Sequence, residues 1–216
     1  SKSDRFPNGL GNDSDQLGRN IMDHHLDVGA SGKFDGFEDK YYKGRKPNGV
    51  YIPRFRNLGG SSNTDKFIRG YGYQGGASRR DWQESVKELS YGKDLKEAIL
   101  KPGGWNFGIG GFGEVLPYED NRMYLDYDKP DQWGLPTVTF DAEFKENEWA
   151  MREDMKEQAV AMLEKAGLRD VKPHDDPGAL GLGIHEMGTA RMGRSAKTSV
   201  LNGYNQVHAV KNVYVT

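Results

Sequence analysis

The chain has 216 residues and is 35% hydrophobic, so it is long enough for one sizeable domain with a buried core. Its 30 basic and 32 acidic side chains nearly cancel, and the net charge of -2 offers no attractive field to nucleic acid or to an anionic membrane. The absence of cysteine excludes disulfide scaffolds, thiolate zinc sites and cysteine nucleophiles, and no apolar run reaches the roughly 18 residues that would predict a membrane span.

The N-terminal part of the chain predicts irregular structure followed by short strands. Residues 1–25 are rich in Gly, Asn, Asp and Ser, so we expect an irregular segment that leads into the domain. Apolar residues bounded by turn formers predict strands over Leu26–Lys33 and Gly49–Phe55. Alternation of aromatic with polar or glycine residues predicts a third strand over Phe67–Tyr73.

The middle of the chain predicts two short helices and a glycine-rich strand region. Apolar residues at helical spacing favour a helix over Asp81–Leu89, and a capping-box-like start favours a second over Asp94–Lys101. Alternating apolar residues then predict strand structure over Trp105–Leu116, in which Gly110 and Gly111 are expected to shift the register.

A strand pair and a long helix follow. Met123–Tyr127 and Thr137–Phe144 are predicted strands on either side of a turn at Asp131–Pro136, and we expect them to pair antiparallel. A helix is predicted over Asn147–Ala166, because a stripe of apolar residues keeps helical spacing and Gly167 supplies a stop. The members of that stripe are Met151, Met155, Ala159, Met162 and Ala166.

The C-terminal part is predicted to be mostly loop. We expect a loop over Pro173–Gly183 and a final short strand over Asn212–Val215. Several strands followed by one long helix, without regular alternation of the two, favour the α+β class. The sequence therefore predicts one domain over residues 1–216, built on a mostly antiparallel mixed sheet with helices packed on one face.

The most specific chemical signal is a histidine in a glycine-rich loop. His185 lies in Gly-Ile-His-Glu-Met-Gly-Thr-Ala-Arg-Met-Gly, residues 183–193. A histidine side chain exchanges a proton near neutral pH, and neighbouring glycines let the backbone approach a ligand closely. The pattern predicts an active-site loop built around one proton acceptor.

This loop, with the segment Ser199–Thr216 after it, resembles the C-terminal part of the glucose-methanol-choline (GMC) flavin oxidoreductases. Near the other end, residues 9–24 resemble the passage with which that family enters its substrate domain, and Asp131–Pro136 resembles a turn between two of its strands. The resemblance implies the substrate-binding domain of an FAD-dependent oxidoreductase that acts on CH–OH groups. It also implies that His185 is the base, which accepts the hydroxyl proton while a hydride leaves to the flavin.

The resemblance implies that most of the FAD site lies outside these residues. The family opens with a strand, a Gly-x-Gly-x-x-Gly turn and a helix that holds the dinucleotide. Gly108–Gly113 has that glycine spacing, but Pro117 follows too closely for a helix, so we expect a glycine-rich strand or bulge there. The FAD-binding domain is then expected elsewhere in the same parent chain, with a second catalytic His or Asn beyond Thr216. As an excised piece, this chain is expected to be inactive alone.

Other polar groups in the sequence favour structural explanations. Arg191 is expected to orient the loop and Thr189 to cap a turn, and Thr189 stands where a zinc-protease motif would need its second histidine. Asp23–His25 and His174–Asp176 contain metal-ligand residue types, but adjacent residues rarely point at one ion and carboxylate-rich loops are usually solvated. We therefore expect no metal site.

Aromatic residues beside glycines indicate a substrate class. Flat side chains flanked by polar groups commonly line sugar sites, and Tyr73, Trp105 and Phe107 are the residues predicted to face the substrate. Core packing explains such residues equally well. The leading hypothesis is oxidation of an alcohol group of a sugar or polyol. Two alternatives stay open: a non-catalytic carbohydrate-binding module and a purely structural interaction domain.

Overall fold

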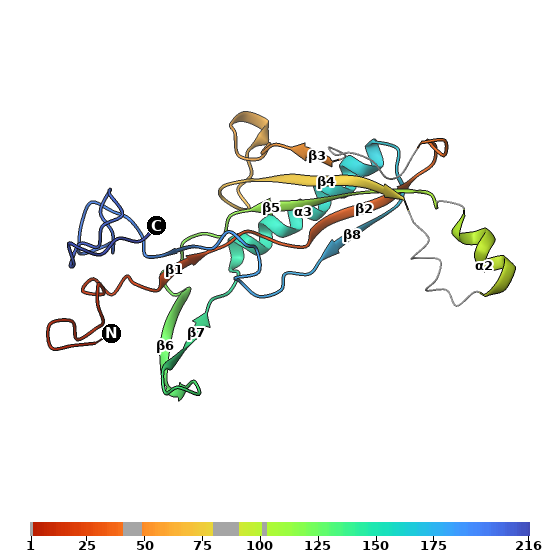
Figure 1. Ribbon diagram of the computed structural model, residues 1–216. Coiled ribbons are helices and arrows are strands. Elements are labelled where there is room, and N and C mark those ends of the chain that lie inside the picture. The colour runs from red at the N-terminus through yellow and green to blue at the C-terminus, as the bar shows by residue number, and fades with distance from the viewer. Residues whose placement is uncertain (1, 41–48, 80–90, 101–102) are drawn as a thin grey trace. The chain divides into compact units, whose positions relative to one another are not determined.

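The computed structural model describes residues 2–40, 49–79, 91–100 and 103–216. Internal contacts divide the chain into two compact units, each built from segments that are far apart in the sequence. Both contain antiparallel strands, and the long helix belongs to the second, so the predicted α+β class is confirmed (Figure 1). The strands form two sheets, one in each unit. Unit 1 comprises Ser1–His24, Glu114–Lys145 and Ala179–Thr216, and unit 2 comprises His25–Gly113 and Glu146–Gly178.

Unit 2 contains a five-stranded sheet in the order β3-β4-β5-β2-β8, and all neighbouring strands are antiparallel. The unit also has a short 3₁₀ helix, η1 (Gly60–Ser62), and α2 (Gly92–Ile99), which confirms the second of the two predicted short helices. The first, at Asp81–Leu89, lies outside the described residues. The strands are β2 (Val28–Phe34), β3 (Gly49–Ile52), β4 (Tyr71–Arg79), β5 (Trp105–Gly113) and β8 (Arg169–Asp175).

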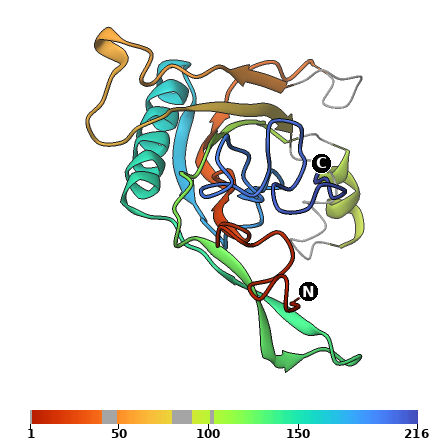
Figure 2. The same cartoon turned by 90° about the vertical axis from the view of Figure 1, so that its left-hand side faces the viewer.

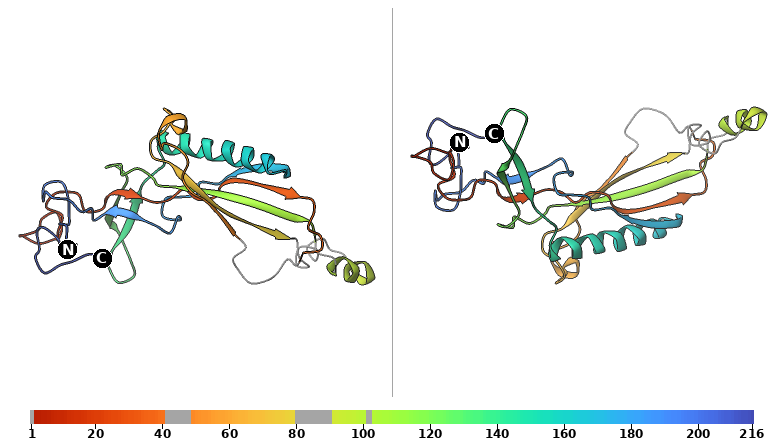
Figure 3. Two further views of the ribbon diagram at one scale, coloured as in Figure 1. Left: turned by 90° about the horizontal axis from the view of Figure 1, so that it is seen from above. Right: turned by 90° about the horizontal axis from the view of Figure 1, so that it is seen from below.

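Helix α3 (Glu146–Lys165) lies along one face of this sheet, as Figure 2 and Figure 3 show. The sequence predicted the helix to within one residue at each end. Three members of its apolar stripe reach the core, but Leu163 takes the place that the spacing gave to Met162. Gly167 ends the helix as expected, and the N–H of Leu168 donates back to the carbonyl oxygen of Leu163 at 3.1 Å. The buried cluster consists of Val28, Ala30, Phe67, Tyr71, Tyr73, Ile109, Met151, Met155, Ala159 and Leu163.

Charged side chains of α3 are also buried, which the apolar stripe did not predict. Asp154 accepts hydrogen bonds from Nε and Nη2 of Arg56, both at 2.8 Å, and from the hydroxyl of Tyr71. Arg152 donates from Nε to Asp175 at 2.8 Å. Burial, reinforced by the bond to Asp154, raises the pKa of Tyr71 well above its ordinary value. These pairings offset the cost of burying the charges of Asp154 and Arg152.

Three strand predictions in unit 2 are corrected by the structure. β4 begins later than predicted and runs further, because Phe67 packs into the core from a loop. β5 pairs with both neighbours in an unbroken register, so the shift expected at Gly110–Gly111 does not occur. β8 includes Pro173–Asp175, where a loop was predicted, because a strand at the edge of the sheet tolerates proline and polar residues.

Unit 1 contains a four-stranded sheet in the order β7-β6-β1-β9, which is also antiparallel. β6 and β7 form the predicted hairpin, drawn in green in Figure 2. Its turn is fixed by Asp131, whose carboxylate accepts the N–H groups of Trp133 and Leu135, both at 2.9 Å. The strands are β1 (Arg19–Met22), β6 (Arg122–Pro130), β7 (Pro136–Asp141) and β9 (Met187–Thr189).

The two short strands of unit 1 were missed from the sequence. β1 lies in the segment 1–25 that was expected to be irregular, and β9 lies in the glycine-rich loop after His185. Strands of four and three residues are too short for periodicity to reveal them. The final strand predicted at Asn212–Val215 is wrong, since an isolated bridge between Gln206 and Tyr214 forms in its place. In the described part of the chain, no helix is long and apolar enough to cross a membrane.

Two glycines that face each other in the five-stranded sheet test its register. Gly29 of β2 pairs with Gly110 of β5. A Cβ at Gly29 would overlap the carbonyl oxygen of Ile109, whereas a Cβ at Gly110 would have its nearest neighbours at 4.0 Å. We expect Gly29→Ala to lower the free energy of unfolding by about 2 kcal/mol or more, and Gly110→Ala to change it by less than about 0.5 kcal/mol. Denaturant unfolding of the complete protein measures both, and equal effects would contradict this register.

Candidate functional site

His185 lies in unit 1 on the loop that leads into β9, and its side chain is exposed to solvent. Ile184, the residue before it, has a φ of 59°, a left-handed conformation that is rare for a β-branched residue. The Ile184 side chain is 78% exposed and contributes little to the core. The backbone therefore turns sharply just before the histidine and presents the imidazole at the surface.

A buried carboxylate fixes this loop. Asp23, which is 1% exposed, accepts at Oδ2 the N–H groups of Gly181 and Gly183, at 2.8 and 2.9 Å. Its Oδ1 accepts the N–H of His24 at 2.7 Å. Only glycine fits at position 183, because a Cβ there would collide with the Asp23 carboxylate and lie 2.7 Å from the carbonyl oxygen of His24. The first glycine of the His185 motif thus permits the close approach of the loop to the end of β1.

The same approach brings two imidazole rings together. Nδ1 of His24 and Nδ1 of His185 are 2.9 Å apart, and the ring centroids are 4.9 Å apart in an edge-on arrangement. One Nδ1 must donate a hydrogen and the other must accept it, so the pair shares one hydrogen at this contact. Sequence reasoning missed this pairing, because it placed His24 in the segment that resembles the family's entry passage and among possible metal ligands, and not beside His185.

The backbone of Thr189, in β9, and of Arg191, just after it, is held by hydrogen bonds to other segments of unit 1. The carbonyl oxygen of Thr189 accepts the N–H of Gly18 at 2.7 Å. The carbonyl oxygen of Arg191 accepts the N–H groups of Val200 and Leu201, at 3.0 and 3.1 Å. Thr189 and Arg191 therefore lie in backbone that is fixed by hydrogen bonds, on the C-terminal side of His185.

A pocket of about 580 Å³ opens beside the His185 loop within unit 1. Most of its lining is apolar, and Glu186 and Thr189 contribute the polar side chains. A mostly apolar recess with a few polar groups is typical of small-molecule sites. The apolar lining includes Ile21, Met123, Phe140, Leu180, Leu182 and Met187.

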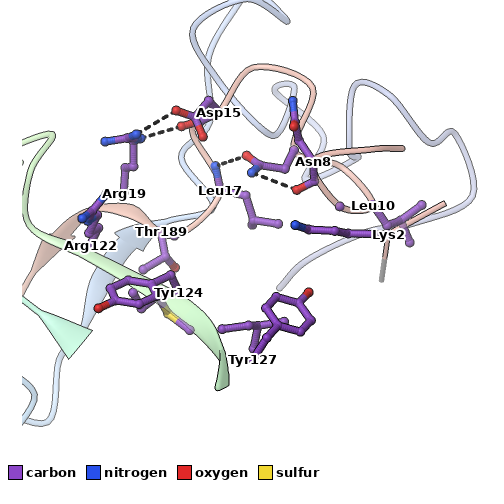
Figure 4. Close-up of a pocket in the computed structure, with 15 residues that line it drawn as sticks. Lys2, Asn8, Leu10, Asp15, Leu17, Arg19, Arg122, Tyr124, Tyr127 and Thr189 are labelled. Atoms are coloured by element: carbon purple, nitrogen blue, oxygen red, sulfur yellow. Dashed lines mark hydrogen bonds and ion pairs between the residues drawn. The ribbon is translucent and has the colours of Figure 1, made fainter. Parts of the chain in front are cut away.

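A second pocket of unit 1, about 460 Å³ in volume, is drawn in Figure 4 and shares Thr189 with the first. Arg19 pairs with Asp15 at 2.7 Å, and Arg122 lies 3.6 Å from Asp141. Because both guanidinium groups already face carboxylates, they give the pocket little net positive charge for a phosphate group. Its lining also includes Lys2, Leu10, Leu17, Tyr124 and Tyr127.

The three aromatic residues predicted to face the substrate all lie in unit 2. Tyr73 is fully buried and its hydroxyl donates to the carbonyl oxygen of Met155 at 2.6 Å, so it offers no surface to a ligand. Trp105 and Phe107 line an apolar pocket of about 520 Å³, where Nε1 of Trp105 donates to the carbonyl oxygen of Phe37 at 2.9 Å. The structure thus brings Trp105 and Phe107 together, assigns Tyr73 to the core, and places His185 in the other unit.

The glycine-rich runs do not form a dinucleotide-binding turn. Gly108–Gly113 lies in β5, which is paired with β2 on one side and β4 on the other, as expected for a glycine-rich strand. Gly70–Gly75 has the same spacing, which sequence reasoning overlooked, and it overlaps β4. Strand backbone that is already paired cannot cradle a pyrophosphate, and β5 leads into an irregular segment rather than a helix.

The residue types that suggested metal ligands have other surroundings in the structure. Asp23 and His24 are engaged with the His185 loop, and His174 lies on β8 opposite Gly29. Among the residues that the structure describes, no group of three or more His, Asp or Glu side chains could hold a metal ion.

Comparison with known proteins finds similarity along the whole chain. Residues 117–216 match the family model for GMC oxidoreductase. The chain is 29% identical to the 2-methyl-1,2-propanediol dehydrogenase of Mycolicibacterium austroafricanum over 222 residues, which covers 97% of this chain and 38% of that protein. It is also 29% identical to the fructose dehydrogenase large subunit of Gluconobacter japonicus, with coverage of 99% and 38%. The paromamine 6'-oxidase of Streptomyces fradiae is 26% identical, with coverage of 100% and 36%.

The chain spans less than two fifths of the length of each of these relatives. The segment matched by the family model contains the His185 loop, and the relatives extend the similarity to the N-terminal half. The resemblance recognised in the sequence is confirmed: residues 117–216 match the GMC oxidoreductase family model, and the similarity to the three relatives extends over the whole chain.

Proposed function

We propose that this chain is the substrate-binding domain of an FAD-dependent oxidoreductase that oxidises an alcohol group of a sugar or polyol, with His185 as the base. The proposal depends chiefly on one observation: the exposed His185 imidazole, engaged at Nδ1 by His24, within the segment that matches the family model. With Nδ1 engaged, we assign the role of proton acceptor to Nε2 of His185, in the tautomer that carries its hydrogen on Nδ1.

The reaction needs a base at this position. A carbinol carbon is a poor hydride donor until its oxygen begins to carry negative charge. Nε2 of His185 accepts the hydroxyl proton as the C–H bond breaks, so the substrate becomes a carbonyl compound and His185 becomes an imidazolium. FAD, when bound, supplies the acceptor for the hydride that leaves with both electrons of the C–H bond. A positioned base typically contributes about 10²- to 10⁴-fold to the rate.

The substrate class is inferred from the relatives and from the pocket beside the loop that carries His185. By their names, the relatives act on 2-methyl-1,2-propanediol, fructose and paromamine, which favours a substrate with several hydroxyl groups. The pocket combines an apolar lining with Glu186 and Thr189, a combination suited to a carbon skeleton with a polar rim. Trp105 and Phe107 stay candidates for substrate contact, whereas the buried Tyr73 is left out.

FAD would be held mainly by residues outside this chain, since Gly108–Gly113 lies in the paired strand β5 and Gly70–Gly75 overlaps the paired strand β4. We therefore place the FAD-binding domain in another part of the same polypeptide, and we expect the 216-residue chain alone to be inactive. Mixing FAD with the isolated chain and removing the excess should leave colourless protein. A retained yellow chromophore would contradict this division of the enzyme.

Anaerobic mixing of the complete protein with different alcohols tests the substrate class. We expect a sugar or polyol to bleach the flavin absorbance, and a monohydric aliphatic alcohol at the same concentration to do so at least about tenfold more slowly. Saturable sugar binding without any bleaching would instead identify a carbohydrate-binding module. The absence of both sugar binding and flavin bleaching would favour a structural interaction domain.

A further inference from the structure

The contact between His24 and His185 gives the second histidine a function of its own. We propose that His24 is a positioning residue, which holds His185 in the one tautomer that can act as a base. This inference rests on the proposed function of His185.

The two histidines lie just beyond the end of the short ladder between β1 and β9. Met22 pairs with Met187 in this antiparallel ladder. The ladder ends at this pair, after a register shift between Arg19 and Met22, and His24 and His185 each lie two residues beyond it, on the two segments that the ladder brings together. The 2.9 Å separation of their Nδ1 atoms is the result.

Both rings are attached to the same buried carboxylate through short stretches of backbone. Asp23 accepts the N–H of His24 itself and the N–H of Gly183, two residues before His185. The distance between the imidazoles is therefore set by a fixed anchor rather than by a long, loosely held loop. Such a supported pair is preorganised for one hydrogen-bonding arrangement.

The position of one hydrogen decides whether His185 can be a base. A neutral imidazole carries its hydrogen on one nitrogen only. If His24 donated from Nδ1, the hydrogen of His185 would lie on Nε2, and that atom could not accept a proton. If His185 donates from Nδ1 to Nδ1 of His24, its Nε2 keeps a lone pair for the hydroxyl proton. The donated hydrogen bond also persists after His185 becomes an imidazolium, so His24 must act as the acceptor throughout.

Two substitutions of His24 in the complete protein separate this role from packing. His24→Asn keeps an acceptor, the amide oxygen, near the place of Nδ1, whereas His24→Phe keeps a flat ring without an acceptor. We expect His24→Phe to slow flavin reduction at saturating substrate by about 10- to 100-fold, with the substrate dissociation constant changed by less than about threefold. His24→Asn should recover most of the rate. Equal losses in the two variants would mean that His24 only fills space, and would overturn the inference.

¹⁵N NMR of the complete protein, labelled at its histidines, measures the tautomer of His185 independently. The signals of His185 are those that disappear in His185→Ala. We expect hydrogen on Nδ1 of His185 in the wild type and in His24→Asn, and a shift toward hydrogen on Nε2 in His24→Phe. Hydrogen on Nε2 of His185 in the wild type would overturn the inference.

If His185→Ala leaves flavin reduction intact, the proposed function fails. If His185→Ala abolishes reduction but His24→Phe does not slow it, the role of His24 alone fails.

Discussion

Replacing His185 with alanine is expected to slow flavin reduction in the complete protein by about 10²- to 10⁴-fold while leaving the flavin bound. The side chain is exposed and belongs neither to the buried cluster of unit 2 nor to the smaller apolar cluster of Val200, Leu201 and Val207, so its loss should not unfold the unit that carries it. The reduction in rate then arises at the step in which the substrate loses its hydroxyl proton. Anaerobic rapid mixing measures that step directly, and the ratio of flavin to protein reports whether the cofactor is retained.

Lys197→Ala provides the control for the His185 variant. Lys197 is exposed and lies in the same C-terminal segment of unit 1, so its removal should leave the reduction rate at the wild-type value. If His185→Ala and Lys197→Ala reduced flavin equally fast, the base would have to be another group.

The second large effect is expected at Asp23. Alanine at this position would deprive the N–H groups of His24, Gly181 and Gly183 of their charged acceptor. A hydrogen bond to a charged group contributes about 1.5–3 kcal/mol, so we expect the loop to open more easily by about 3 kcal/mol. That difference corresponds to roughly 100-fold faster hydrogen exchange at the Gly181 and Gly183 amides. Because the same carboxylate positions His185, flavin reduction should also slow by about tenfold or more.

Asp13→Ala is the matched control for Asp23→Ala. Asp13 is an exposed aspartate of the same N-terminal segment, and its removal should change local stability by less than about 0.5 kcal/mol. Hydrogen–deuterium exchange of peptides that contain Gly181 and Gly183, followed by mass spectrometry, compares the two variants. Identical exchange in both would show that the Asp23 carboxylate does not hold the loop.

Helix α3 and the β6–β7 hairpin could be predicted because their signals are local and periodic. The stripe that includes Met151, Met155 and Ala159 repeats at helical spacing, and Asp131 begins a turn between two alternating segments. The predicted strands overlap β2, β3, β4 and β5 of the five-stranded sheet but have wrong ends, and β8 was not predicted as a strand. A strand ends where its pairing ends, and pairing depends on partners that are distant in the sequence.

The role of Tyr73 shows where alternation stops being informative. The pattern correctly indicates a strand around Tyr73, but it does not say which face of the sheet is covered. Helix α3 covers the face of Tyr73, so the side chain is buried and bonded to Met155 rather than exposed to a ligand. The buried Asp154 and Arg152 likewise depend on partners in other elements, Arg56 and Asp175.

The candidate site could be predicted only in part. The composition of the loop and the family resemblance both indicated His185, because glycines and a histidine are local features. The contact of His185 with His24 joins residues 161 positions apart and depends on the register of two strands too short to predict. Asp23 appeared as part of the family-like segment 9–24 and as a possible metal ligand, since nothing in the sequence shows that its carboxylate receives three N–H groups from the loop and from His24.

Proton transfer to His185 is tested most directly by changing how readily the substrate loses its hydroxyl proton. Electron-withdrawing groups near the reacting carbon make the hydroxyl more acidic, so the substrate depends less on a base. We predict that the ratio of the wild-type to the His185→Ala reduction rate falls steadily across a series of alcohols of increasing acidity. A ratio that stays constant across the series would contradict the account, because His185 would then be supporting the site without taking the proton.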